Sequence, residues 1–262
     1  MSEVDLLAAL RRESARFLAV LRAVEPATPV PSCPGWTASD LLWHLCEVQW
    51  FWATIVTDRL DDPGTAEDAK PDRPRTHADL AELMARSTAR LHDALASADP
   101  FTPVWTWTDD RTVGFVRRRQ AHEALIHRVD AELTADSLTP LDPPLASDGI
   151  DELLRVCHAA WPGWATFTPD ASVIRIEAQD TGTAWHLTTG RWRGTSPNTG
   201  TTYDELGVSV VADETDRDVA LRGDASTLDR WLWGRIPRDG LSVDGDQAAL
   251  EVLDAVVAEG IE

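Results

Sequence analysis

Apolar residues in the N-terminal half of the chain recur at intervals of three and four, which is the spacing of amphipathic helices. The first run covers residues 7–24, and a second begins after the proline-rich segment PVPSCPGW. Thr37 stands three residues before Asp40, a pair typical of a capping box, so we expect the second helix to begin near Ala38. The same periodicity predicts two more helices, over residues 78–98 and 113–133.

Long polar connections separate these helices. The segment 61–75 is rich in Asp and Pro and is predicted to be a loop that crosses the end of a bundle. Residues 136–148 contain three prolines and are predicted to be a linker. Four helices of about 20 residues with long connections predict a four-helix bundle, which we assign to residues 1–140.

The pattern of apolar positions changes after the linker. Three short runs alternate apolar and polar residues, as strands of a half-buried antiparallel sheet do. We therefore predict a smaller α+β domain over residues 147–262, and an α+β, two-domain fold for the 262-residue chain. The predicted elements of this domain are helices over 147–160, 225–235 and 247–259 and strands over 172–178, 183–189 and 207–212.

The formal net charge of −20 is spread along the chain rather than gathered into a tail. It disfavours nucleic acid as a partner, because phosphate would be repelled over most of the surface. No apolar run approaches the roughly 18 residues of a membrane span, and the N-terminus lacks the order of a signal peptide. We expect a cytoplasmic protein without a membrane partner, and the sequence leaves the oligomeric state open.

Three cysteines, Cys33, Cys46 and Cys157, are widely spaced. They predict neither a disulfide framework nor a CxxC zinc site, and we interpret them as reduced thiols. Serine-hydrolase elbows, Walker loops and dinucleotide fingerprints are absent from the sequence.

Three side chains on two predicted helices are candidates to share a metal ion. Glu123 and His127 are i,i+4 neighbours, so both can reach one ion from a single helix surface. His44 belongs to a stripe at spacing 3,4,3,4 that should face the core. A histidine there that meets the Glu/His pair would make a two-His, one-carboxylate site with open coordination positions, the catalytic pattern. The other members of the stripe are Leu41, Val48, Phe51 and Ile55.

The segment HEALIH differs from the zincin motif HExxH. His122 and His127 are five residues apart, about 140° around a helix, so they cannot easily share an ion. Asp130 lies on the same stripe as Glu123 and His127, and we expect it to accept a hydrogen bond from a ligand imidazole. His122 is then left to face a neighbouring helix or solvent.

Other assignments of these residues stay open. Glu47 and His92 are possible substitute ligands, whereas Cys46 projects from a different helix face than His44 and is a poor one. Without a metal, His44 is a hydrogen-bonded core histidine. The Glu/His pair is then a surface contact that contributes only about 0.2–0.5 kcal/mol.

Two N-terminal segments, CPGWTASDLLWHL (33–45) and RRQAHEALIHRVDAEL (118–133), resemble the mycothiol-dependent maleylpyruvate isomerase family. LRGDASTLDRWLWGR (221–235) is similar to the C-terminal pattern of that family. The resemblance implies a DinB-like four-helix metal-binding bundle followed by a sterol-carrier-like α+β domain. The metal ligands of the family fall on His44, Glu123 and His127. Zinc is the ion that we expect, with manganese, iron or nickel as alternatives.

The resemblance also implies thiol chemistry. A low-molecular-weight thiol, mycothiol in the family, would bind at the open position as the thiolate and add to a small electrophile. In the isomerase the electrophile is maleylpyruvate and the product fumarylpyruvate, and other members resemble thiol S-transferases. Arg222 and Arg235 are candidates for binding substrate carboxylates, with surface ion pairs as the alternative. The competing hypotheses are a non-catalytic ligand-binding or stress-related module and a thiol-independent metal hydrolase.

Overall fold

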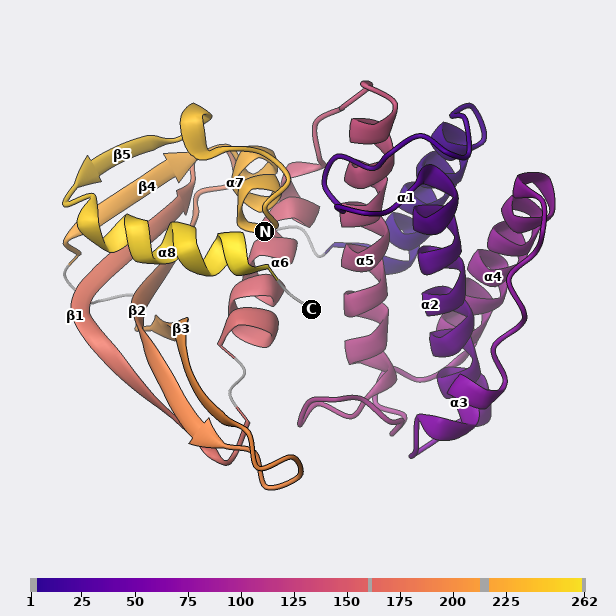
Figure 1. Ribbon diagram of the computed structural model, residues 1–262, viewed down its shortest axis with the longest axis horizontal. Coiled ribbons are helices and arrows are strands. Elements are labelled where there is room, and N and C mark those ends of the chain that lie inside the picture. Colours follow the sequence, from indigo (N-terminus) through magenta and orange to yellow (C-terminus); the bar gives the residue numbers. More distant parts are fainter. Residues whose placement is uncertain (1–3, 160–161, 213–216, 261–262) are drawn as a thin grey trace. The chain divides into compact units, whose positions relative to one another are not determined.

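The computed structural model describes residues 4–159, 162–212 and 217–260 (Figure 1). The chain divides into two compact units, Asp5–Thr139 and the residues from Pro140 onward. The first unit is helical, and the second combines a sheet with helices. The predicted two-domain α+β fold is confirmed.

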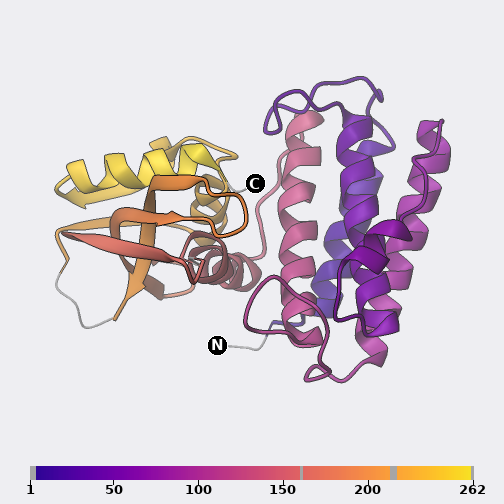
Figure 2. The same ribbon diagram turned by 60° about the horizontal axis from the view of Figure 1, so that its bottom comes forward.

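Four long helices run side by side in the first unit (Figures 1 and 2). They begin and end close to their predicted positions. A single-turn helix, α3, lies within the segment 61–75, where we predicted only a loop, because five residues are too few to show an apolar period. The helices are α1 (Leu6–Leu21), α2 (Ala38–Asp58), α3 (Gly64–Asp68), α4 (His77–Ser97) and α5 (Val113–Thr134).

The start of α2 is fixed by the predicted capping box. The hydroxyl of Thr37 accepts a hydrogen bond from the backbone N–H of Asp40, whose carboxylate accepts one from the backbone N–H of Thr37 at 2.9 Å. The hydrogen bonds from Thr37 and from Arg73 lower the pKa of Asp40 to about 2. The carboxylate therefore stays charged and fixes the residue at which α2 begins, about two turns before His44.

The core of the first unit lies between α1, α2 and α4 and reaches α5. On α2 the side chains of Leu41, Leu45 and Cys46 are fully buried, whereas the His44 side chain is 30% exposed. The prediction that His44 faces the core was therefore wrong in detail. Leu42 and Gln49 are also buried, so the buried face of α2 is centred beside the predicted stripe and His44 lies at its edge.

Buried ion pairs join α1 to α5. The fully buried carboxylate of Glu132 accepts hydrogen bonds from Arg16 Nε at 2.7 Å and from Arg128 Nη1 at 3.0 Å. Arg128 Nε also lies 2.9 Å from Glu13 Oε2. Although burial raises the pKa of Glu132, its hydrogen bonds outweigh burial and lower the pKa below its ordinary value. The network fixes α5 against α1 from within the core.

The second unit holds a five-stranded sheet in the order β3-β2-β1-β4-β5. In Figure 1, α8 lies across this sheet. The strands are β1 (Ala165–Ala178), β2 (Thr183–Thr195), β3 (Thr202–Val211), β4 (Val219–Gly223) and β5 (Ser242–Gly245). The helices are α6 (Pro143–Glu152), the π-helical η1 (Leu153–His158), α7 (Ala225–Leu232), the short η2 (Arg238–Gly240) and α8 (Ala248–Glu259).

The three predicted strands lie in β1, β2 and β3, which pair antiparallel as predicted. β1 pairs antiparallel with β2, but β4 pairs parallel with β1, so the sheet is mixed. We did not predict β4, because Val219, Ala220 and Leu221 are all buried and the strand shows no apolar/polar alternation. The predicted linker 136–148 is also too long, since α6 begins inside it at Pro143.

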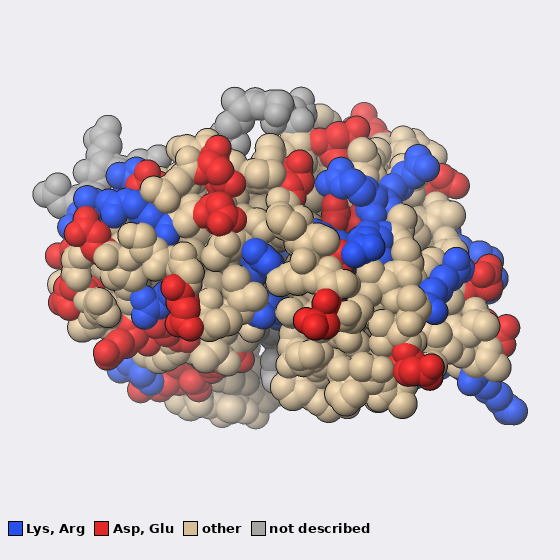
Figure 3. All heavy atoms as spheres, turned by 90° about the horizontal axis from the view of Figure 1, so that it is seen from above, with Lys and Arg blue, Asp and Glu red and all other residues tan. Residues whose placement is uncertain are grey.

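The charged side chains are interspersed on the face shown in Figure 3, where acidic and basic groups lie among each other. No described helix has the length and apolarity needed to cross a membrane.

The buried network predicts a stability difference between two glutamates. Glu132→Ala should lower the free energy of unfolding of the helical unit by about 3 kcal/mol, because the buried guanidinium of Arg128 loses one of its two carboxylate partners. Glu82→Ala removes the exposed pair with Arg22 and should cost less than about 1 kcal/mol. Urea unfolding followed by circular dichroism measures both, and equal costs would contradict this assignment.

Candidate metal centre

The structure brings together the three side chains that the sequence singled out. Glu123 Oε1 lies 3.5 Å from His44 Nε2 and 3.2 Å from His127 Nε2. The rings of His44 and His127 meet edge to face, with centroids 4.8 Å apart. One ligand atom from each residue lies within 4.8 Å of the others, so a single ion could contact all three.

The position of each residue follows from its helix. Glu123 and His127 are one turn apart on α5, so their side chains project from one face. His44 is on α2, in the second turn after the capping box, and reaches Glu123 across the contact between the two helices. The carboxylate therefore receives one imidazole from its own helix and one from the neighbouring helix.

A second layer of contacts orients His127. Its Nδ1 lies 2.9 Å from Asp130 Oδ2, and a buried carboxylate can only accept, so Nδ1 carries a proton. Ser32 donates its hydroxyl hydrogen to the other oxygen of Asp130 at 2.6 Å. This arrangement directs the lone pair of neutral His127 to Nε2, the nitrogen beside Glu123. The predicted contact between Asp130 and a candidate ligand imidazole is present.

The charges of the cluster are strongly coupled. Burial alone would lower the pKa of His127, but its hydrogen bonds to Asp130 and Glu123 outweigh burial and raise the pKa to about 9. Burial likewise raises the pKa of Glu123, but hydrogen bonds from His127 and His44 hold it well below its ordinary range. Without a metal ion, the carboxylate is therefore paired with an imidazolium at neutral pH.

The cluster is accessible from one side. His127 is buried, whereas the side chains of His44 and Glu123 are 30% and 18% exposed. The Trp36 ring packs against the His44 ring with centroids 4.9 Å apart. Arg119 Nη2 lies 3.4 Å from the second oxygen of Glu123. Solvent or a ligand can thus approach at His44.

The donor set fits a divalent transition metal. Two imidazole nitrogens and one carboxylate oxygen are the ligands of many catalytic zinc sites, and three protein ligands leave a coordination position open. Second-layer partners such as Asp130 are usual for metal-bound histidine.

The other candidate ligands lie outside this cluster. His122 is buried, and His92 lies 3.4 Å from Asp93 on α4. Burial raises the pKa of the Cys46 thiol to about 11, and its sulfur contacts Ser87. Sequence reasoning assigned no role to Ser32 or Trp36. The only sequence feature that marks these two residues is their place in the segment PVPSCPGW, which precedes α2.

The two arginines predicted to bind substrate carboxylates belong to the second unit. Arg222 on β4 lies 3.4 Å from Glu177 and 3.6 Å from Asp244, so acidic side chains already pair with it. Arg235, which follows α7, donates to the Trp233 carbonyl oxygen at 2.6 Å, and its guanidinium lies over the Trp233 ring. A role for Arg222 and Arg235 in substrate binding stays a prediction.

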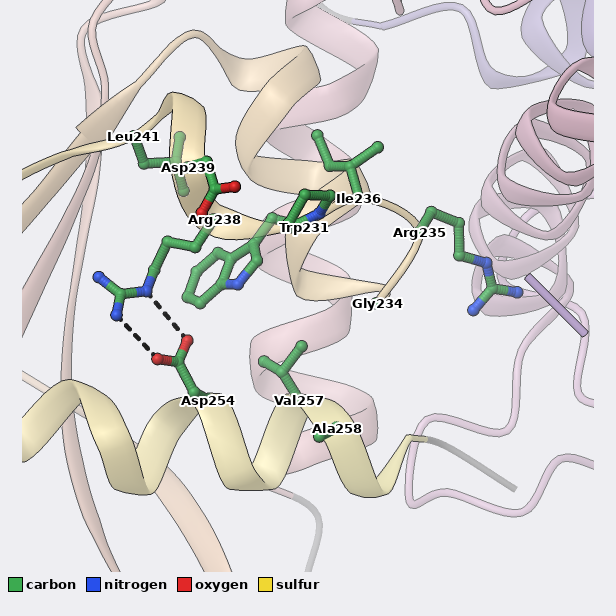
Figure 4. A pocket seen from close by; sticks show the side chains of 11 residues that line it. Trp231, Gly234, Arg235, Ile236, Arg238, Asp239, Leu241, Asp254, Val257 and Ala258 are labelled. Carbon is green, nitrogen blue, oxygen red and sulfur yellow. Dashed lines mark hydrogen bonds and ion pairs between the residues drawn. The ribbon is translucent and has the colours of Figure 1, made fainter. Parts of the chain in front are cut away.

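A pocket of about 670 Å³ lies beside α7 and α8 in this unit (Figure 4). Arg238 donates two hydrogen bonds to Asp254 along one wall, at 3.1 and 2.9 Å, and Arg235 points away from the pocket. Trp231 supplies an aromatic wall. The charged pair makes this pocket a poor fit for the lipid-like ligand of a non-catalytic binding module.

Two models of known protein families match the chain. The family model described as the mycothiol maleylpyruvate isomerase N-terminal domain matches residues 7–132, and that of the MDMPI C-terminal domain matches residues 144–252. A comparison with curated proteins found no match.

Two solved structures resemble the whole chain. They are the crystal structures of the mycothiol-dependent maleylpyruvate isomerase, at 14% identity, and of a histidine-to-alanine mutant of that isomerase, at 13% identity. Each has a TM-score of 0.59 and covers 92% of this chain and 92% of its own. At this identity the likeness shows a shared fold. Because the two family models match most of the chain in the expected order, the chain belongs to the mycothiol-dependent maleylpyruvate isomerase family.

Proposed function

We propose that this protein is a metal-dependent enzyme that uses mycothiol either to isomerise a small electrophilic substrate or to conjugate the thiol with it, as an S-transferase does. We propose further that this substrate carries a carboxylate. The observation that supports this proposal is the convergence of His44, Glu123 and His127 from two helices of a bundle that belongs to a thiol-dependent family.

Each residue of the cluster has a distinct role in this proposal. Nε2 of His44, Nε2 of His127 and a carboxylate oxygen of Glu123 would hold a zinc ion or a similar dication. When bound, such an ion would supply positive charge that favours the thiolate form of a neighbouring thiol. Asp130 keeps the Nδ1 proton of His127 in place, and Ser32 keeps Asp130 in place.

The reaction requires no nucleophilic side chain from the protein. In an isomerisation, the thiolate sulfur adds to one carbon of an activated cis double bond, and the electron pair of that bond moves into the conjugated carbonyl group. The carbon–carbon bond, which is now single, rotates. The electron pair then returns and expels the thiolate, which leaves a trans double bond. In an S-transfer the carbon–sulfur bond is kept, and the neighbouring carbon takes up the proton that the thiol lost. The protein has to hold the sulfur, position the electrophile and exclude competing water.

The carboxylate of the substrate requires a positive partner. We retain Arg222 and Arg235 as proposed partners, because a planar guanidinium matches a carboxylate with two parallel hydrogen bonds. In the structure Arg222 pairs with Glu177 and Asp244, so a substrate carboxylate would have to compete with these acids.

Thiol dependence distinguishes this proposal from metal-assisted hydrolysis. Zinc-loaded protein should turn over maleylpyruvate, or conjugate electrophiles of its class, only when mycothiol is present. Mass spectrometry of the products with and without mycothiol measures this. Turnover of an ester or amide substrate without any thiol would instead support a zinc-bound water as the nucleophile.

Metal content tests the site directly. Wild-type protein reconstituted with zinc should hold about one equivalent per chain, and His44→Ala should hold far less while keeping its helical circular dichroism, because a partly exposed side chain is removed. His92→Ala, which changes a histidine of α4 outside the cluster, is the matched control and should retain zinc. A folded His44→Ala variant that keeps its zinc would refute the assignment.

The affinity for zinc should depend on pH. Because the pKa of His127 is about 9 without metal, zinc must displace a proton at neutral pH. The apparent association constant should therefore rise about tenfold per pH unit as pH increases towards 9, and then level off. Competition with a chromophoric chelator, corrected for the protons that the chelator itself binds, measures this slope. An affinity that does not change with pH would contradict the coupling between His127 and Glu123.

A further inference from the structure

A half-exposed aromatic cluster lies on the same two helices as the candidate metal ligands. The Trp107 ring contacts Trp52 of α2 and Phe115 of α5, with centroids 5.7 and 5.2 Å apart. Trp105 stacks on Trp52 at 5.8 Å. Trp52 and Phe115 are buried, whereas Trp107 is 50% exposed. The cluster thus holds the Trp107 indole through tilted and edge-to-face contacts and leaves half of this residue exposed to solvent.

The contacts fix the distance between this cluster and the metal ligands. Trp52 is eight residues after His44 on α2, and Phe115 is eight residues before Glu123 on α5. His44 contacts Glu123, and Trp107 joins Trp52 to Phe115, so α2 and α5 run antiparallel. The pair Trp52 and Phe115 therefore lies eight residues along both helices from the pair His44 and Glu123. Eight helical residues rise about 12 Å. The exposed indole therefore lies about two turns along the α2–α5 contact from the candidate metal ligands.

Trp107 is presented by an anchored turn. The backbone N–H of Val104 donates to the carbonyl of Arg111 at 3.1 Å, and that of Trp105 to the carbonyl of Leu60 at 2.7 Å. The hydroxyl of Thr106 donates to the backbone carbonyl of Asp110 at 3.0 Å. Two of these bonds close the turn on itself, and the bond to Leu60 ties it to the residues that follow α2, so the exposed indole has a defined position before any ligand binds.

The turn that carries the indole also carries exposed polar residues of both kinds. Asp109 and Asp110 are exposed and offer carboxylate oxygens as acceptors, and exposed Arg111 offers guanidinium donors. An aromatic surface on a turn that also carries acceptors and donors suits a ring that is apolar on its faces and carries hydroxyls at its rim. A plain aromatic ring would leave these polar groups unused.

The charge of the protein favours a neutral ring. With a net charge of −20 and two acidic residues in the turn itself, the surface disfavours phosphate-bearing or carboxylate-bearing rings. A neutral polyol meets no such repulsion, and its hydroxyls can donate to the carboxylates and accept from the arginine.

We propose that Trp107 binds a distal polyol ring of the thiol cosubstrate. This inference rests on the proposed function, which places the thiol sulfur at His44, Glu123 and His127. Mycothiol joins its N-acetylcysteine through an amide to a glucosamine that carries an inositol ring, so its neutral rings lie well away from the sulfur. A substituent close to the reacting carbon of a small electrophile would not reach the indole two turns away. Trp107 is therefore a binding residue that selects a long sugar-bearing thiol over a short one.

The sulfur-free half of the thiol tests the site without the metal. Glucosaminyl-inositol with its amine acetylated, so that it is neutral as in the thiol, should bind to zinc-free and to zinc-loaded protein alike in isothermal titration calorimetry. Trp107→Ala should weaken this binding about tenfold, because it removes the stacking face, and Trp107→Phe should restore part of it. Phe101→Ala is the matched control, since Phe101 is 86% exposed in the same connection, and it should leave the binding unchanged.

The outcomes separate the two proposals. Absence of glucosaminyl-inositol binding in wild type, or equal binding by wild type and Trp107→Ala, would overturn the ring site. Binding that depends on Trp107 in a protein that takes up no zinc would support the ring site and refute the proposed metal function.

Thiol selectivity provides the second test. With zinc-loaded protein, Trp107→Ala should raise the KM for mycothiol about tenfold and leave kcat and the KM for N-acetylcysteine unchanged. An equal loss with both thiols would overturn the proposal, because a general structural defect would then explain it. A change confined to the KM of the electrophile would also overturn it, because the indole would then belong to the site of the other substrate.

Discussion

The candidate site depends on one partly buried carboxylate that two imidazoles share. Glu123 contacts His127 on its own helix and His44 on a neighbouring helix. The same carboxylate therefore joins α2 to α5 and holds the two candidate ligand histidines together. Taking a carboxylate out of water is costly unless it is paired and hydrogen-bonded. Without metal, a proton on His127 supplies the compensating charge, and the raised pKa of that histidine is the consequence. A dication held by these three side chains would replace this proton and supply more positive charge.

The remainder of the bundle keeps this arrangement in place. Asp130 and Ser32 fix the orientation of His127, and the pairs of Glu132 with Arg16 and of Arg128 with Glu13 fix α5 against α1. The capping box of Thr37 and Asp40 fixes the residue at which α2 begins. Rigid helices with locked side chains can hold ligands within the tolerance that metal binding demands. The accessible side of the site, at His44, is where these constraints are fewest.

Much of this site could be predicted from sequence because it is built from local rules. The i,i+4 spacing of Glu123 and His127, the capping box and the contact of Asp130 all follow from the geometry of single helices. That His44 faces Glu123 could not be derived this way, because no local pattern tells which helices meet, and only the family resemblance pointed to it. The partial exposure of His44 was missed for a related reason. Periodicity finds the apolar face of a helix but places its edge only to within about one residue.

The sheet shows the limits of pattern reading more clearly. β4 was not predicted, because a central strand buried on both faces has no alternation to detect, and its parallel pairing with β1 is a property of topology. The position of Trp107 was not foreseen either. The two tryptophans of this polar connection show no helical or strand period. Only the structure shows that their rings pack against Trp52 of α2 and Phe115 of α5.

The central claim is that a metal ion at His44, Glu123 and His127 receives the sulfur of a thiol substrate. X-ray absorption spectroscopy of zinc-loaded protein, recorded before and after addition of mycothiol, tests this most directly. We expect a zinc ion with nitrogen and oxygen neighbours only. It should gain one sulfur neighbour at about 2.3 Å when mycothiol is added. Zinc that already has a sulfur neighbour in the absence of thiol, or that gains none in its presence, would contradict it.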